Sequence, residues 1–297
     1  MSESTETKKE KKMNIAQAKK AVIEAIDENQ NGEIDIEDIV IKGFKTPGIR
    51  IKRENFLRKE LVKICTEDVI KVAVDKNPMA ANIPLEEIDK IADEVIKFER
   101  ACVSGISAAL GVPGGWAMVA TIPADIIQYY AYMLRAAQKL LYLYGFPEIT
   151  SDEEGVHIDS GTMNILILCL GVMYGVGGAK NALLALSKAL GHGVKKELMK
   201  KALTKGTLYP IIKKICKWFS VSLTKEVFTS FFEKAIPLVG GAVGGAITYL
   251  SFKPCCDKLK ESLQDTVFTN PDRANDSTII DVEVEGIKDG DRDDTEE

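Results

Sequence analysis

The sequence predicts an all-α protein: a multi-helix domain with glycine-rich apolar helical hairpins, preceded by a short helix-loop-helix and followed by an acidic tail. Two observations support this prediction. Apolar residues recur every three or four positions through most of the chain, which is the period of an amphipathic helix. Strand-like alternation appears only in the short run Thr278–Val284, which we interpret as a strand or a docking peptide.

Composition divides the chain into four parts. Residues 1–12 are charged and of low complexity, which is typical of a disordered leader. Residues 13–48 hold a polar loop between two helical patterns, and residues 49–268 form the main helical domain. Residues 269–297 form the tail, which carries 11 acidic and 3 basic residues from Asn270 onward. We expect this tail to be disordered and to bind a protein partner.

Three helices of the main domain are predicted from periodicity and helix breakers. The first is expected over residues 55–76, and the second from Leu85 past Phe98 toward Leu110. Two prolines, Pro78 and Pro84, separate them. A third helix is expected over residues 123–144, because Pro123 suits a first helical turn.

Three long runs of the chain contain no charged residue: Ala101–Ala124, Ser160–Ala179 and Ala235–Phe252. The first two approach the roughly 20 apolar residues that a membrane span requires. Glycines interrupt all three runs, and prolines two of them, so we favour close-packed hairpins of a buried core. Small residues spaced by four, such as Gly171 with Gly175, let two helix backbones approach closely.

The composition also excludes some functions. The net charge is -5 and the pI about 5.4, so no general affinity for nucleic acid is expected. The six cysteines form no CxxC pair, which suits a reducing compartment. The first residues lack an apolar stretch, so we expect no signal peptide and a cytoplasmic location.

The segment Asp27–Asp38 has the spacing of a twelve-residue cation loop. Hard cations take oxygen ligands at fixed positions, and a glycine at position 6, here Gly32, allows the sharp turn. The expected metal ligands are Asp27, Asn29, Asn31, Glu33 (through its backbone carbonyl), Asp35 and Asp38. Over residues 13–45 the chain therefore resembles an EF-hand.

Two features depart from the EF-hand pattern. Position 12 is Asp38 instead of Glu, so its carboxylate is one methylene shorter and bidentate coordination is weakened. The loop also has no paired second loop. We expect Ca2+, with Mg2+ as the alternative ion; a solvated turn capped by Asp and Asn is the alternative without any metal.

Two further blocks resemble the EcsC family of bacterial proteins, over about residues 55–265. The first contains Gly111-Val-Pro-Gly-Gly-Trp116 and continues through residues 122–130 and 134–148; the second is residues 236–249. The resemblance implies an all-helical domain from a bacterial source, with a membrane connection. It implies no catalytic residues.

One face of the predicted helix 123–144 is polar and aromatic. It includes Asp125, Gln128, Tyr132 and Arg135 and continues through Lys139 and Tyr142. This pattern is typical either of a pocket or partner groove or of a solvated face, and we favour the solvated face.

The region Lys195–Phe219 combines eight lysines with Trp218 and aliphatic residues, as an interfacial membrane helix does. Without a catalytic motif, we expect a non-enzymatic, membrane-associated protein. It would bind peripherally to an anionic surface at the inner face of the cell membrane, and the cation loop would stabilise or regulate it. Two alternatives stay open: a soluble enzyme or carrier for an apolar small molecule, and a membrane-permeabilising effector.

Overall fold

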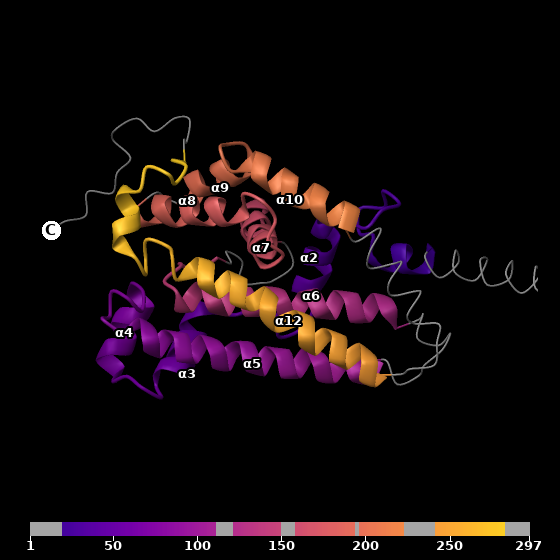
Figure 1. Ribbon diagram of the computed structural model, residues 1–297, viewed down its shortest axis with the longest axis horizontal. Coiled ribbons are helices and arrows are strands. Elements are labelled where there is room, and N and C mark those ends of the chain that lie inside the picture. Colours follow the sequence, from indigo (N-terminus) through magenta and orange to yellow (C-terminus); the bar gives the residue numbers. More distant parts are fainter. Residues whose placement is uncertain (1–19, 111–120, 150–157, 194–195, 223–240, 283–297) are drawn as a thin grey trace, which may run out of the picture.

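The computed structural model describes residues 20–110, 121–149, 158–193, 196–222 and 241–282 of the 297-residue chain (Figure 1). Its elements in chain order are α2 (Ile36–Lys45), α3 (Arg53–Leu61), α4 (Glu67–Asp75), α5 (Leu85–Leu110), α6 (Ile122–Leu143), α7 (Ser160–Met173), α8 (Ala179–Gly191), α9 (Lys196–Thr204), α10 (Tyr209–Ser222), α12 (Gly241–Leu263) and the 3-10 helix η3 (Pro271–Asn275). These ranges contain helices and no strand, which confirms the predicted all-α class.

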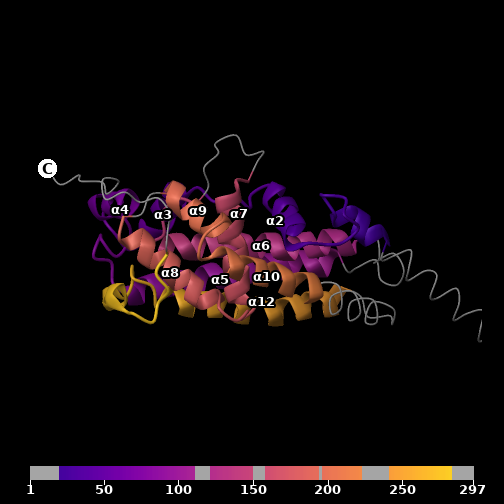
Figure 2. The ribbon, with the colours of Figure 1, turned by 90° about the horizontal axis from the view of Figure 1, so that it is seen from above.

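The helices are arranged around α7. Figure 1 views α7 almost along its axis, whereas α5, α6 and α12 run along the long axis of the molecule below it. In this view α9 and α10 lie above α7, and α8 lies beside it (Figure 1). Figure 2 shows from a second side that α3 and α4 lie at one end of the molecule. The C-terminal end of α10 and the N-terminal end of α12 lie at the opposite end (Figures 1 and 2).

Glycines allow the closest helix contacts. A Cβ added at Gly245 of α12 would lie 2.9 Å from the Ala108 Cβ and 3.0 Å from the Ser104 carbonyl oxygen of α5. Nearly the whole length of α7 is buried, including every residue from Leu166 to Met173. The charge-free run that begins at Ser160 therefore forms core. No helix within the described ranges is long and apolar enough to span a membrane.

The predicted helices at residues 85–110 and 123–144 are confirmed as α5 and α6. The single helix predicted at residues 55–76 is wrong, because α3 ends at Leu61 and α4 begins at Glu67. Arg53 closes this hairpin: it is buried, and its guanidinium donates hydrogen bonds to the carbonyls of Ala73, Val74 and Lys76 at the end of α4. Those carbonyls lack helical partners, so the long-range bonds favour two short helices.

The prediction that the tail is disordered from Asn270 is wrong for residues 270–282. Ile279 is buried, and Asp281 pairs with Lys188 of α8 at 2.7 Å. Arg273 in η3 pairs with Asp265 at 2.7 Å, which holds the segment beside the end of α12. The leader, residues 1–12, and the remainder of the tail, residues 283–297, lie outside the described residues.

Candidate functional site

The predicted cation loop connects a helical segment, residues 20–26, to α2. Gly32 has φ +86°, which a side chain would strain, so the glycine at position 6 is required by the turn. Ile34 at position 8 is buried, and its burial fastens the loop to the protein. Asp27 accepts hydrogen bonds from the backbone N–H groups of Asn31, at 3.2 Å, and Gly32, at 2.8 Å.

The side chains at positions 3, 5 and 9 point toward one another. The amide nitrogens of Asn29 and Asn31 lie 3.5 Å and 2.7 Å from the Asp35 Oδ2. The Oδ1 atoms of Asn29 and Asn31 each accept a backbone N–H and keep a second lone pair. Within the described part of the chain, no group of three or more His, Cys, Asp or Glu side chains is arranged to hold a metal. Glu33 follows them in the loop and is exposed.

Asp38, at position 12, is buried and joins the beginning of the loop to its end by hydrogen bonds. It is only 1% exposed, and its two oxygens accept the backbone N–H groups of Glu28, at 3.2 Å, and Asp35, at 3.1 Å. Burial raises the pKa of the Asp38 carboxyl, although the two backbone hydrogen bonds oppose the shift. Both oxygens of Asp38 therefore already have a backbone partner within the loop.

The loop contacts α10 through a residue that lies 185 positions further along the chain. The Ser220 hydroxyl donates a hydrogen bond to the Asp35 Oδ1 at 3.1 Å. One turn earlier, Cys216 lies against Glu37 of α2, and burial together with that carboxylate raises the pKa of the Cys216 thiol. Sequence analysis missed both residues, since neither belongs to a motif and only the fold brings them to the loop.

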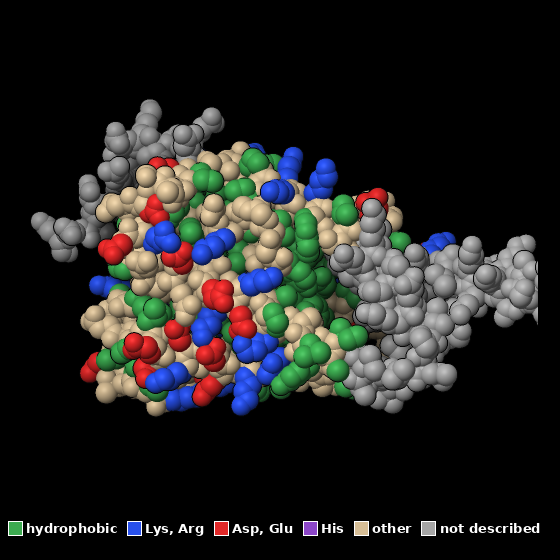
Figure 3. Space-filling view, in the orientation of Figure 1, with side chains coloured by type: hydrophobic (Ala, Val, Ile, Leu, Met, Phe, Trp, Pro, Cys, Tyr) green, Lys and Arg blue, Asp and Glu red, His purple; other side chains and the backbone are tan. Residues whose placement is uncertain are grey.

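The exposed face of α10 is basic along its length and apolar at its C-terminal end. Ile212, Ile215 and Phe219 are buried against the body of the protein. The opposite face exposes Lys213, Lys214, Lys217, Trp218 and Val221. In Figure 3, Lys and Arg side chains stand over α10, and an apolar band lies between α10 and α12. Within the predicted basic region, Lys195 itself lies outside the described residues.

The polar face of α6 is directed into the protein, toward α5. Glu99 of α5 is fully buried and accepts from Lys139 at 2.5 Å, with the Arg135 Nε 3.3 Å away. Arg135 also lies 5.6 Å from the ring centroid of Tyr132. The favoured interpretation of a solvated face is therefore wrong. Lys139 and Arg135 are directed inward because they pair with the buried carboxylate of Glu99, which lies 40 residues before Lys139 in the chain.

The N-terminal half of this face is also enclosed. Asp125 accepts a hydrogen bond from the Ser107 hydroxyl at 2.6 Å, and burial raises the pKa of its carboxyl. The buried Nε2 of Gln128 and Oγ of Ser104 have no hydrogen-bond partner within the described part of the chain. The predicted residues Asp125, Gln128, Tyr132 and Arg135 thus lie along the side of α6 that packs against α5.

Comparisons of the chain with protein-family models, with curated proteins and with solved structures found no match. The resemblance to the EcsC family therefore stays a prediction.

Proposed function

We propose that this protein is a non-enzymatic, EcsC-like peripheral membrane protein that binds an anionic lipid surface through α10 and is regulated by a cation in the Asp27–Asp38 loop. One observation carries the proposal. The face of α10 that is directed outward is basic and apolar, while the same helix contacts the cation loop through Ser220.

The exposed face of α10 supports lipid binding on physical grounds. Each lysine near an anionic membrane contributes about 1 kcal/mol, so Lys213, Lys214 and Lys217 together contribute about 3 kcal/mol. Trp218 is 37% exposed, and its ring is held at 5.6 Å from that of Tyr174. A partly exposed Trp beside lysines suits the boundary between headgroups and acyl chains.

A second apolar surface lies toward the same end of the molecule. The first half of α12 exposes Ile247 and Leu250, and neighbouring α5 exposes Ile106. No charged residue occurs on α5 after Arg100 or on α12 before Lys253. Exposed apolar surface without charge favours contact with lipid over contact with water.

The nearness of the loop to α10 supports regulation by charge and by contact. A divalent cation would neutralise acidic side chains near the basic helix, which removes repulsion between the loop and anionic lipid. A cation that coordinates Asp35 would also compete for the carboxylate that now accepts from Ser220. We therefore expect Ca2+, or Mg2+ in its place, to strengthen lipid binding.

The test is flotation of the full-length protein with vesicles that contain phosphatidylserine, in parallel calcium and chelator arms. We expect more protein to float with calcium, and the double variant Lys213→Glu/Lys217→Glu to lose flotation in both arms. The control variant Lys59→Glu/Lys71→Glu makes the same charge change at exposed positions of α3 and α4. It should float like the wild type.

Two outcomes would overturn the proposal. Equal loss of flotation in both double variants would mean that net charge, and not α10, determines binding. A calcium effect that survives Asp27→Ala, which removes the ligand at position 1, would mean that calcium acts on the lipid and not through the loop.

A further inference from the structure

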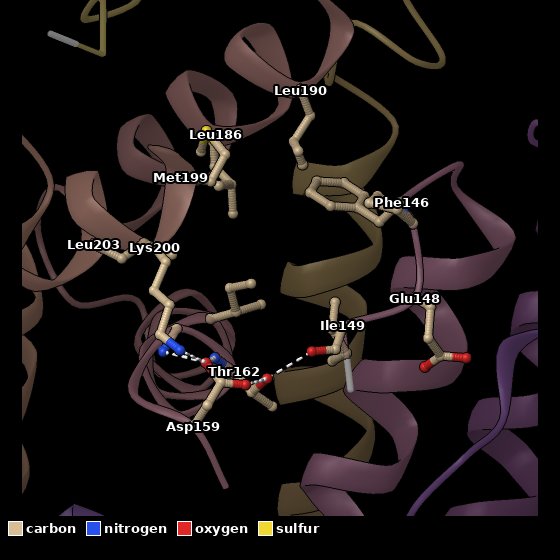
Figure 4. A pocket seen from close by; sticks show the side chains of 13 residues that line it. Phe146, Glu148, Ile149, Asp159, Thr162, Leu186, Leu190, Met199, Lys200 and Leu203 are labelled. Atoms are coloured by element: carbon tan, nitrogen blue, oxygen red, sulfur yellow. Dashed lines mark hydrogen bonds and ion pairs between the residues drawn. The ribbon is translucent and has the colours of Figure 1, made fainter. Parts of the chain in front are cut away.

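A cavity of about 180 Å3 lies between α7, α8, α9 and the segment that follows α6 (Figure 4). Its wall is largely apolar and is formed by Phe146, Ile165, Leu186, Leu190, Met199 and Leu203. Figure 4 shows the labelled side chains among these converging from both sides on one space. An apolar cavity of about 150 Å3 stays free of water and accepts a molecule the size of benzene.

One end of the cavity is polar. The Lys200 ammonium lies 3.1 Å from the Asp159 Oδ1, and the Thr162 hydroxyl donates to the Asp159 Oδ2 at 2.7 Å (Figure 4). Asp159 also caps α7 by accepting from the backbone N–H of Gly161 at 2.8 Å. The Asp159 carboxylate also lies near the Thr162 N–H, at 3.3 Å. The single proton of the Thr162 hydroxyl can go either to Asp159 or to the Ile149 carbonyl, which lies 2.6 Å away.

Lys200 has bonding capacity that Asp159 does not use. An ammonium has three donors, and the Lys200 side chain is 46% exposed, so the polar end of the cavity is also its accessible end. Its stem lies over the backbone of α7, because a Cβ at Gly161 would be 3.1 Å from the Lys200 Cγ. The ammonium is therefore held at the mouth of an aliphatic cavity.

We propose that this cavity binds a medium-chain aliphatic carboxylate, with the chain among the leucines and the carboxylate on Lys200. By comparison with the six carbons of benzene in about 150 Å3, a volume of about 180 Å3 holds about seven carbon atoms, with the carboxylate at the mouth. A carboxylate would gain a charge-assisted hydrogen bond from Lys200, against repulsion from Asp159, which already pairs with this ammonium, and from Glu148 in the lining. The proposal is independent of the lipid surface on α10.

Octanoate is the probe, with octanol as the same chain carrying a neutral head. Titration calorimetry of the full-length protein should show one octanoate site. Lys200→Met should weaken octanoate binding by about tenfold and leave octanol binding unchanged. Lys201→Met, at an exposed neighbour outside the cavity lining, should change neither ligand.

A second variant tests the location of the chain. Leu190→Phe places a larger side chain in the cavity and should abolish binding of both octanoate and octanol. Circular dichroism melting confirms that this variant is folded, and Lys200→Met provides an independent test at an exposed position. The proposal is overturned if millimolar octanoate does not bind, or if binding is unchanged in both Leu190→Phe and Lys200→Met. Lys213→Glu/Lys217→Glu should bind octanoate normally, which separates this proposal from the membrane proposal.

Discussion

The contact between α7 and α10 can be tested at Gly171. A Cβ added there would lie 2.5 Å from the Ile215 Cδ1, 2.8 Å from its Cγ1 and 3.1 Å from its Cγ2. Ile215 is fully buried and, as a β-branched residue, has little freedom at χ1, so it cannot turn away. Gly171→Ala should therefore force α10 away from α7.

The expected change in the free energy of unfolding is the sum of two opposing effects. Overpacking a core by one methyl costs about 1 to 3 kcal/mol. Replacing glycine by alanine within a helix recovers about 1 kcal/mol. Taking about 2 kcal/mol for the overlap, Gly171→Ala should destabilise the wild type by about 1 kcal/mol. In an Ile215→Ala background the overlap is gone, and the same change should stabilise by about 1 kcal/mol.

The assay is urea unfolding of the four proteins of this double-mutant cycle, followed by circular dichroism at constant m-value. The expected result is a change of sign, with a coupling free energy of about 2 kcal/mol. If Gly171→Ala has the same effect in both backgrounds, α7 and α10 do not meet through Gly171 and Ile215. The position of α10 beside the loop would then also be in doubt.

Three further predictions concern other contacts. Arg53→Lys removes the planar group that reaches three carbonyls at the C-terminal end of α4 and should cost about 3 kcal/mol in urea unfolding. Arg58→Lys, in an exposed ion pair, should cost much less. Equal losses of stability in the two variants would refute the role of Arg53. Ile279→Ala should cost about 2 kcal/mol and speed amide exchange in residues 270–282; unchanged exchange would contradict the packing of this segment. Burial raises the pKa of the Asp38 carboxyl above 3.8, so protons compete with calcium for this side chain. The calcium-induced rise in Tm should therefore disappear as the pH falls through the raised pKa of Asp38. In chelator, the stabilising contribution of Asp38 is present below pH 3.8 and is lost as the pH rises through the raised pKa. A calcium effect on Tm that persists below pH 3.8 would contradict the competition between protons and calcium. In chelator, an Asp38→Asn variant whose stability changes with pH like that of the wild type would contradict the contribution of Asp38.

Features encoded over a few neighbouring residues were predictable. The start of α5 comes directly after Pro84, and the start of α6 has Pro123 in its first turn, so local backbone chemistry places both helices. The spacing of Asp27, Asn29, Asn31 and Gly32 likewise needs no distant partner, because each hydrogen bond within that turn joins residues at most five apart.

The sequence by itself determined the helical class, the position of the loop and the basic character of α10, since each depends on the order of neighbouring residues. Only the tertiary structure decided that Lys139 and Arg135 are directed inward, because the attracting charge, Glu99, comes from another helix. It also decided that Ser220 meets Asp35 and that α9 closes the cavity above α7. The pattern of one helix shows how polar each of its faces is, whereas the charge, hydrogen bond or cavity that a face meets is set by residues far away in the chain.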